Sequence, residues 1–230
     1  MSHKHNKLWT FWEGSSRHWR ASMSLHCWRV TNPELSIETL DKEAALDLFP
    51  HLHKYTNTTV QRFTDILRLS LIFEFGGMWS DLSVLPMKPI ASLLEAHSVG
   101  GTFLYKFDPR VKHSRHDGRI ATSWFLVGRA GSSFFNKWLD RFLWNLENDG
   151  TAYKNYFLCH TSLTQLYDEG DVDIVSVIDG LRLDANFDNK DGPHGSPKLP
   201  IPCPDKLPFM YKRPGNVKWG HINEFHRKYY

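Results

Sequence analysis

Short apolar runs and longer periodic segments alternate along the chain. Runs that are apolar or alternating and that end near Gly, Pro or Asn are typical of β-strands; they occupy 7–14, 35–41, 78–85, 100–107, 121–129 and 172–178. Apolar residues recur at helical spacing in 17–29, 42–55 (with a break near Pro50), 59–75, 134–149 and 155–168. Strands that alternate with helices predict an α/β fold built on a layered sheet.

The segment 59–75 carries the clearest helical pattern, and two stripes run along it. The apolar stripe consists of Val60, Phe63, Leu67 and Leu71. Gln61, Asp65 and Arg68 form a narrow polar stripe on another face. An exposed Asp65–Arg68 pair would contribute only a few tenths of a kcal/mol. In a helix that is otherwise apolar, such a pair needs further partners, so a structural ion pair and a binding site both stay open.

The stretch "EFGGMWSDLSV" follows this helix without a break. Gly76 and Gly77 permit a sharp turn and a close approach of the backbone to a ligand. In an extended strand, Asp81 and Ser83 would share one face with Trp79. Two oxygen donors spaced two residues apart suit a hard cation, which would also hold a diphosphate. Helix and strand are therefore predicted to deliver their polar residues to one region.

The ordered set D-x-x-R, Gly-Gly and D-x-S resembles a known family. The segment "TDILRLSLIFEFGGMWSDLSV" (64–84) is similar to the nucleotide-sugar site of glycosyltransferases with a DxD-type motif, and most similar to the capsular polysaccharide synthesis group. "LWTFWEG" with "SLHCWRVTNPELSIETLD" (24–41) resembles the opening of that group, and "ATSWFLVGRAGSSFF" (121–135) resembles its middle block. The resemblance is strongest over about 60–90.

This resemblance implies a GT-A-like fold, a Rossmann-like sheet that binds a nucleotide-sugar. It implies a glycosyltransferase that moves a sugar from a UDP- or GDP-sugar donor to a glycan or polysaccharide acceptor, with retention of the anomeric configuration. The implied cofactor is a divalent metal, Mn²⁺ or Mg²⁺. Gly76 and Gly77 are implied to belong to the donor-binding set.

Residue by residue, the resemblance implies that Trp12 stacks near the nucleobase. Asp65 and Arg68 would hold the ribose, the sugar hydroxyls or the diphosphate. Asp81 would anchor the metal and the donor, and it is the implied catalytic residue together with Arg68. Ser83 stands where relatives of this kind carry a second aspartate. Serine is a weak metal ligand, so Ser83 would act on the metal through water or contact the sugar.

Composition and charge exclude several other classes. Hydrophobic residues make up 41% and charged residues 23%, as in ordinary globular proteins. The net charge of +3 without long runs of like charge gives no electrostatic case for a nucleic-acid partner. The three cysteines form no CxxC pair, which argues against a disulfide framework or a zinc site. Without a signal-like or membrane-spanning apolar run, we expect a soluble cytoplasmic protein.

From about residue 181 the regular pattern is lost, because seven of the 12 prolines lie between Pro193 and Pro214. We expect one domain over 1–230 whose segment 181–230 is rich in loops. The stretch "DANFDNKDG" (184–192) imitates a calcium loop but lacks its glycine and closing glutamate, so we interpret it as a polar loop. The segment "YKRPGNVKWGH", with Lys212, Trp219 and His221, is a candidate for closing over the donor.

For several residues the sequence leaves two interpretations open. His113, His116 and Asp117 are either a solvated basic loop or a metal cluster. His160 is either a core histidine or a residue that reaches the site. Two other functions also stay open: a sugar-binding or scaffold protein without turnover, which Ser83 favours, and a metal-dependent hydrolase of nucleotide-sugars.

Overall fold

A computed structural model gives the fold of the chain over residues 6–14, 19–107, 119–150, 154–181 and 210–212. Its centre is a mixed five-stranded sheet with the strand order β2-β1-β3-β6-β5. The central strand β1 (Lys7–Phe11) pairs in parallel with β2 (Ser36–Leu40) and with β3 (Gly77–Ser80). The antiparallel half consists of β6 (Ala121–Gly128) and β5 (Phe103–Lys106). The predicted α/β class is therefore confirmed.

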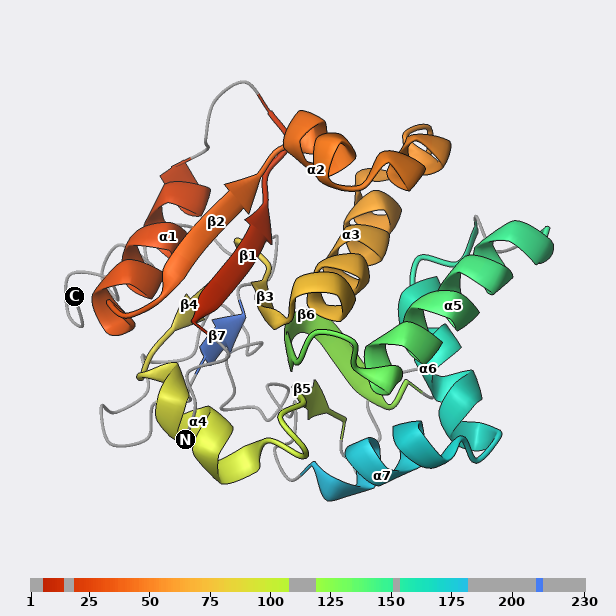
Figure 1. Cartoon of the computed structure of the whole chain (residues 1–230). Coiled ribbons are helices and arrows are strands. Elements are labelled where there is room, and N and C mark those ends of the chain that lie inside the picture. Colours follow the sequence, from red (N-terminus) through yellow and green to blue (C-terminus); the bar gives the residue numbers. More distant parts are fainter. Residues whose placement is uncertain (1–5, 15–18, 108–118, 151–153, 182–209, 213–230) are drawn as a thin grey trace, which may run out of the picture.

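Helices cover both faces of this sheet (Figure 1). Helix α1 (Trp19–Thr31) connects β1 to β2, and its Trp28 ring stacks on Phe125 of β6. Helix α3 (Val60–Phe75) leads into β3 on the opposite face, where it contacts β1, β3, β6 and α5 (Ser133–Asn148). Trp9 and Phe11 alternate with the other β1 residues and pack their rings on Phe75 and Phe63 of α3.

Helices α1 and α3 lie on opposite faces of the sheet because of the order in which the chain forms its strands. Right-handed crossovers are the rule in parallel sheets. The chain moves from β1 outward to β2, and then back past β1 to β3, so the two crossovers must lie on opposite faces. The strand order thus reverses between β1 and β3. Crevices at such reversal points, beyond the carboxyl ends of the strands, are where open α/β sheets bind ligands.

Short helices complete the path to α3 and to β5. Helix α2 (Lys42–Leu48) begins at Asp41, whose carboxylate accepts from the Ala44 amide. A 3₁₀ helix (Pro50–Tyr55) follows, so the predicted break near Pro50 is confirmed. Helix α4 (Ile90–His97), which the sequence pattern did not predict, begins after Pro89. The Asn32 side chain accepts from the Ile90 amide at 2.6 Å and thereby fixes the start of α4 to the end of α1.

The predicted strand at 172–178 is wrong, because these residues form helix α7 (Val172–Gly180). The Asp171 carboxylate accepts from the Asp173 and Ile174 amides and caps this helix. Its buried residues are Ile174 and Ile178, which are four positions apart, whereas Val172 is 78% exposed. A short apolar run fits both periods, and here the cap and the four-residue spacing decide for the helix.

The predicted single strand at 78–85 is also wrong, because it is interrupted. Strand β3 ends at Ser80, residues 81–83 form a turn, and β4 (Val84–Pro86) then pairs with β7 (Met210–Lys212) in a second, two-stranded sheet. The Val84 amide donates to the Asp81 carbonyl oxygen at 2.9 Å and closes the turn. Asp81 and Ser83 therefore do not share a strand face.

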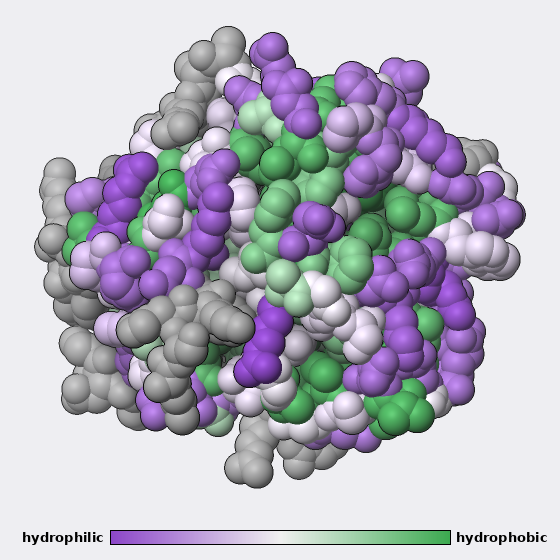
Figure 2. Space-filling model, in the orientation of Figure 1, coloured by the Kyte–Doolittle hydropathy of each residue, from purple (hydrophilic) through white to green (hydrophobic). Residues whose placement is uncertain are grey.

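Helix α6 (Leu158–Asp168) packs on α5 and on β6. The core is rich in aromatic rings, and the buried ring of Trp138 on α5 donates to the Cys159 carbonyl oxygen at 2.7 Å. On the face shown in Figure 2, hydrophilic residues surround smaller hydrophobic areas. Within the described part of the chain, no helix is both long and apolar enough to cross a bilayer.

Candidate functional site

A pocket of about 510 Å³ lies beyond the carboxyl ends of β1 and β3. Four segments build it: the residues that end and follow β1, the start of α1, the first half of α3, and the turn after β3. The lining residues are Phe11, Trp12, Glu13, Ala21, Val60, Gln61, Thr64, Arg68, Asp81, Leu82 and Ser83. The pocket thus occupies the reversal point of the strand order, which is the expected ligand position in such a sheet.

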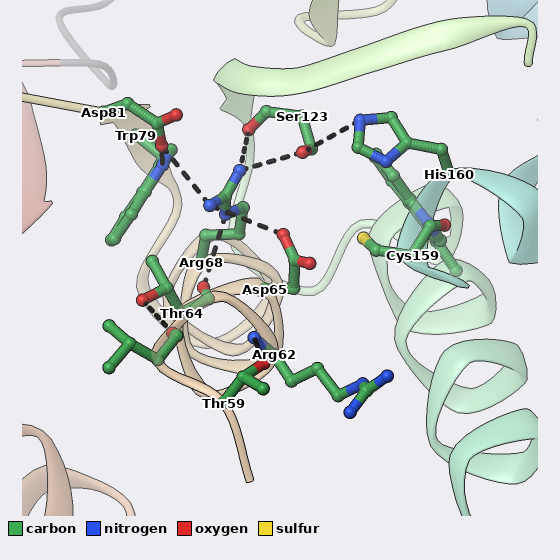
Figure 3. A network of polar contacts seen from close by, with 12 residues as sticks. Thr59, Arg62, Thr64, Asp65, Arg68, Trp79, Asp81, Ser123, Cys159 and His160 are labelled. Atoms are coloured by element: carbon green, nitrogen blue, oxygen red, sulfur yellow. Dashed lines mark hydrogen bonds and ion pairs between the residues drawn. The ribbon is translucent and has the colours of Figure 1, made fainter. Parts of the chain in front are cut away.

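Arg68 is the most constrained polar side chain of the pocket, with only 6% of its surface exposed. Its Nη1 donates to both the carbonyl oxygen and the Oγ of Ser123, at 2.7 and 2.8 Å. Its Nη2 lies 3.4 Å from Asp65 Oδ1 and 3.3 Å from Asp81 Oδ1. The Arg68 guanidinium therefore joins α3, the turn after β3 and strand β6 in one network (Figure 3).

Two carboxylates keep this buried guanidinium charged. Burial alone would lower the pKa of Arg68, but the carboxylates of Asp81 and Asp65 outweigh it, and the net effect raises the pKa above its ordinary value. The cation also lies 5.2 Å from the centre of the Trp79 ring. The pocket therefore contains a fixed positive charge in surroundings that water screens poorly.

Asp81 is held at the end of β3 by its backbone and its side chain. Its amide donates to the Trp124 carbonyl oxygen at 2.9 Å, and its Oδ1 accepts from Trp79 Nε1 at 3.1 Å. The Asp81 side chain is 24% exposed, whereas that of Asp65 is 10% exposed. Of the two carboxylates that flank Arg68, Asp81 is thus the one that a ligand in the pocket can reach.

The capsular polysaccharide synthesis protein family matches residues 47–179, which is more than half of the chain. The chain belongs to this family. The matched range contains the whole polar network and the turn after β3, and leaves out β1 and Trp12. The resemblance found in the sequence is therefore confirmed, and family membership supports its interpretation as a glycosyltransferase.

Several solved structures are similar to this chain in the path of the backbone, at low sequence identity. The PaToxG glycosyltransferase matches at 14% identity over 74% of this chain and 73% of that chain, with a TM-score of 0.46. Apo GlyE from Streptococcus pneumoniae TIGR4 matches at 10% identity over 72% and 44%, with a TM-score of 0.47. An active-site mutant of LgtC matches at 11% identity over 96% and 95%, with a TM-score of 0.47. Among curated proteins, no sequence matches significantly.

The structure brings together most of the residues that the sequence singled out. Trp12, Arg68, Asp81 and Ser83 all line the pocket. Asp65 is in contact with Arg68 but is not among the described lining residues. The polar stripe of the helix and the D-x-S pattern therefore meet at one pocket, although the turn at 81–83 replaces the predicted strand.

Gly76 and Gly77 lie at the opposite end of β3 from Asp81, outside the described lining of the pocket. Their φ angles are 67° and 93°. A Cβ atom on Gly76 would lie 2.7 Å from the Ala130 amide nitrogen, and one on Gly77 would lie 2.6 Å from the Lys7 carbonyl oxygen. The glycine pair thus allows a sharp turn, as expected, but the close approach is to the protein's own backbone.

Sequence reasoning missed Ser123, which is buried in β6 and contacts Arg68 through its carbonyl and hydroxyl oxygens. No local pattern marks it, because it follows Arg68 by 55 positions and meets it only through the packing of α3 on β6. Glu13 and Thr64 also line the pocket and were not singled out. His160 reaches the network, with Nε2 at 3.2 Å from Ser123 Oγ.

Other candidates lie outside the described residues. These are His113, His116, Asp117, Trp219, His221, Cys203 and the segment 184–192. Lys212 ends β7, where its backbone is paired with Val84, the residue after Ser83. Cys27 and Cys159 are buried thiols, and burial raises the pKa of Cys159 far above its ordinary value. A reactive thiolate role for Cys159 is therefore disfavoured.

The oxygen donors of the pocket suit a weakly held hard cation. Asp81 contributes a carboxylate and Ser83 a hydroxyl, both within the pocket lining. Among the described residues, no group of three or more His, Cys, Asp or Glu side chains is arranged to bind a metal. Mg²⁺ is commonly held by one or two carboxylates together with substrate phosphates. This donor set fits that pattern, with a ligand's phosphates supplying the other oxygens.

Proposed function

We propose that this family member is a glycosyltransferase that binds a UDP- or GDP-sugar in the pocket and transfers the sugar to a glycan or polysaccharide acceptor. One observation carries the proposal. The pair of buried Arg68 and partly exposed Asp81, with 3.3 Å between Nη2 and Oδ1, lies in a pocket at the carboxyl ends of β1 and β3. That position suits a nucleotide-diphosphate ligand in a sheet of this type.

The chemistry of the proposed reaction explains the charges. When the bond between the anomeric carbon and the phosphate breaks, positive charge develops on the sugar and negative charge on the leaving diphosphate. A preorganised cation near the leaving group stabilises that charge. Arg68 supplies such a cation, and the partly exposed Asp81 orients it from the pocket side.

In this proposal, each of the remaining lining residues contacts a different part of the donor. The Trp12 ring, half-buried at the end of β1, stacks on the nucleobase. Glu13 and Thr64 offer hydrogen-bond groups for the ribose and sugar hydroxyls. Asp81 with Ser83 would hold Mn²⁺ or Mg²⁺, which when bound neutralises part of the diphosphate charge. Retention of the anomeric configuration, implied by the family resemblance, is part of the proposal.

A thermal-shift panel tests donor binding directly. Purified protein is screened against UDP- and GDP-linked glucose, galactose, mannose and N-acetylglucosamine, each with and without MnCl₂. We expect one nucleotide-sugar to raise the Tm, since a ligand at 100 times its Kd stabilises the folded state by about 2.7 kcal/mol. Asp81→Asn should lose the shift. Asp140→Asn, which changes an exposed carboxylate on α5, should keep it.

Turnover separates this proposal from the two other functions. For the donor that binds, release of the nucleoside diphosphate is followed with and without oligosaccharide acceptors, and the configuration of the product is determined by proton NMR. Binding without release would indicate a sugar-binding protein that has lost catalysis. Release that no acceptor accelerates would indicate a hydrolase. A shift from no member of the panel would contradict the proposed donor class.

A further inference from the structure

We propose that Ser123 and His160 are positioning residues that fix the guanidinium of Arg68 against Asp81. This inference deepens the proposed function and rests on it for the catalytic consequence. Neither residue is among the described lining of the pocket. Both act through Arg68, along the chain of polar contacts drawn in Figure 3.

The two ends of the Arg68 guanidinium are held unequally. Nη1 makes two short contacts to Ser123, at 2.7 Å to the carbonyl oxygen and 2.8 Å to Oγ. Nη2 lies at 3.3 and 3.4 Å from its two carboxylate oxygens, which is longer than the roughly 2.7–2.9 Å of a well-formed charge-assisted hydrogen bond. Ser123 thus anchors one end, and the Nη2 end can move toward a bound anion without releasing the anchor.

The Ser123 hydroxyl needs a second partner to serve as a fixed acceptor. A hydroxyl carries one hydrogen and two lone pairs. Its oxygen accepts from Arg68 Nη1, and His160 Nε2 lies 3.2 Å away on the other side. In the arrangement we propose, the Ser123 hydroxyl and His160 Nε2 share one hydrogen bond. That hydrogen bond turns a lone pair of Ser123 toward Arg68.

Helix α6 holds His160 at this distance. Near the start of the helix, the Cys159 carbonyl oxygen accepts from the buried Trp138 ring at 2.7 Å. The Phe157 ring lies edge-on to the imidazole, with 5.8 Å between the ring centres. These contacts restrict the rotation and the position of His160, so a rigid helix supports the anchor of Arg68.

The first test is kinetic and uses whichever nucleotide-sugar of the panel the wild type turns over. Ser123→Ala removes the hydroxyl and keeps the carbonyl contact. Loss of an outer-shell residue that orients a metal ligand typically costs about 10- to 100-fold in affinity or activity, and we expect a similar range for a residue that orients Arg68. We therefore expect kcat to fall by about that range while KM for the nucleotide-sugar changes less than threefold. A kcat equal to that of the wild type would overturn the proposal.

Matched variants separate positioning from general loss of packing. Ser162→Ala removes another buried serine, whose two described hydrogen bonds join it to α5 and α6, and it should leave kcat unchanged. His160→Leu should lower kcat about as much as Ser123→Ala. His160→Gln, whose amide oxygen can accept from Ser123, should recover most of the rate. Equal losses in Ser162→Ala and Ser123→Ala, or no recovery with Gln, would show a structural role only.

A second readout does not depend on turnover. The two Nη1 contacts should slow rotation of the Arg68 guanidinium, so its Nη groups should give separate ¹⁵N-correlated NMR signals, assigned by their loss in Arg68→Lys. In Ser123→Ala the guanidinium should rotate faster and these signals should average, whereas in Ser162→Ala they should stay separate. If the wild type turns over no nucleotide-sugar, the proposed function fails while this measurement still decides the positioning. Unaltered Arg68 signals in Ser123→Ala would refute it.

Discussion

Arg68 in the middle of α3 and Asp81 at the far end of β3 lie side by side, with 3.3 Å between Nη2 and Oδ1. The helix buries Arg68, and the strand delivers Asp81 to the pocket where 24% of its side chain is exposed. A buried cation thus has one carboxylate partner that solvent and ligands can reach.

We expect Asp81→Asn to abolish transfer and to leave the fold intact. The amide is nearly isosteric and can still accept from Trp79 Nε1 through its oxygen, so packing is preserved while the negative charge is lost. Nucleoside diphosphate release measures activity, and far-ultraviolet circular dichroism with urea unfolding measures the fold. Turnover within threefold of the wild type in a folded Asp81→Asn variant would contradict the assignment.

Arg68→Ala should weaken nucleotide-sugar binding by more than the ~0.2–1 kcal/mol typical of an exposed ion pair. It also leaves Asp65 buried without its cation, and breaking a buried pair in this way costs about 3–5 kcal/mol of stability. The double variant Asp65→Asn/Arg68→Ala separates the two effects, because it restores stability without restoring the cation. Calorimetry with the nucleoside diphosphate should show weak binding in both. Normal affinity in a folded double variant would make the pair purely structural.

Gly76→Ala should destabilise the protein far more than Gly131→Ala. The two φ angles are similar, at 67° and 71°, but Gly76 has a ψ of −163°, which only glycine adopts, and a Cβ there would also lie 2.7 Å from the Ala130 nitrogen. A Cβ atom added at Gly131 would have no neighbour within 4 Å. Gly131→Ala should therefore cost only the roughly 1–2 kcal/mol of stability that a positive φ imposes on alanine. Urea unfolding of both variants compares them. Equal losses would mean that neither the ψ angle nor the close approach contributes.

The structure brings together most of the residues that the sequence singled out, whereas two of the predicted elements around them are wrong. The i, i+3 spacing of Asp65 and Arg68 is a local property of a helix, and the Gly-Gly pair marks its end, so both could be read directly. Asp81 follows within a few residues of that turn. Ser123 could not be found, because its contact with Arg68 depends on the packing of α3 on the distant strand β6, which no local pattern encodes.

The misassigned helix α7 has a similar explanation. Residues 172–178 alternate enough to resemble a strand, and only the packing of Ile174 and Ile178 selects the helical period. The interruption after Ser80 depends on a backbone hydrogen bond from Val84 to Asp81 and on the pairing of β4 with the distant β7. In both places tertiary contacts override a short apolar run, as is usual for segments of this length.

The Asp171 cap of α7 leads to a prediction about pH. Hydrogen bonding from Lys137, reinforced by the Ile174 amide, lowers the pKa of Asp171 below its ordinary value of 3.8. A lowered carboxyl pKa means that the stabilisation is present above pH 3.8 and is lost as the pH falls through the folded-state value. Asp171→Ala should therefore cost about 1 kcal/mol at pH 7, and less below pH 3.8. A difference that stays constant on acidification would contradict the charged cap.

The last prediction concerns Ser83, which lines the pocket beside Asp81 where an Asp-x-Asp relative would carry a second carboxylate. With one negative charge fewer, the site should bind Mn²⁺ weakly until a diphosphate adds its own oxygens. Metal and nucleoside diphosphate should then bind cooperatively, and each must raise the affinity of the other by the same factor. Ser83→Asp should raise the Mn²⁺ affinity of the ligand-free protein and shrink that factor.

Calorimetric titration of Mn²⁺ into the wild type and Ser83→Asp, each with and without UDP or GDP, measures all the terms of this cycle. The matched control is Ser92→Asp, which adds the same charge at an exposed position on α4 and should leave the metal affinity unchanged. The turn at 81–83 places both oxygens in the pocket lining without the strand geometry that the sequence predicted. If Ser83→Asp binds Mn²⁺ no better than Ser92→Asp does, then Ser83 does not face the metal, and its hydroxyl is better assigned to the sugar.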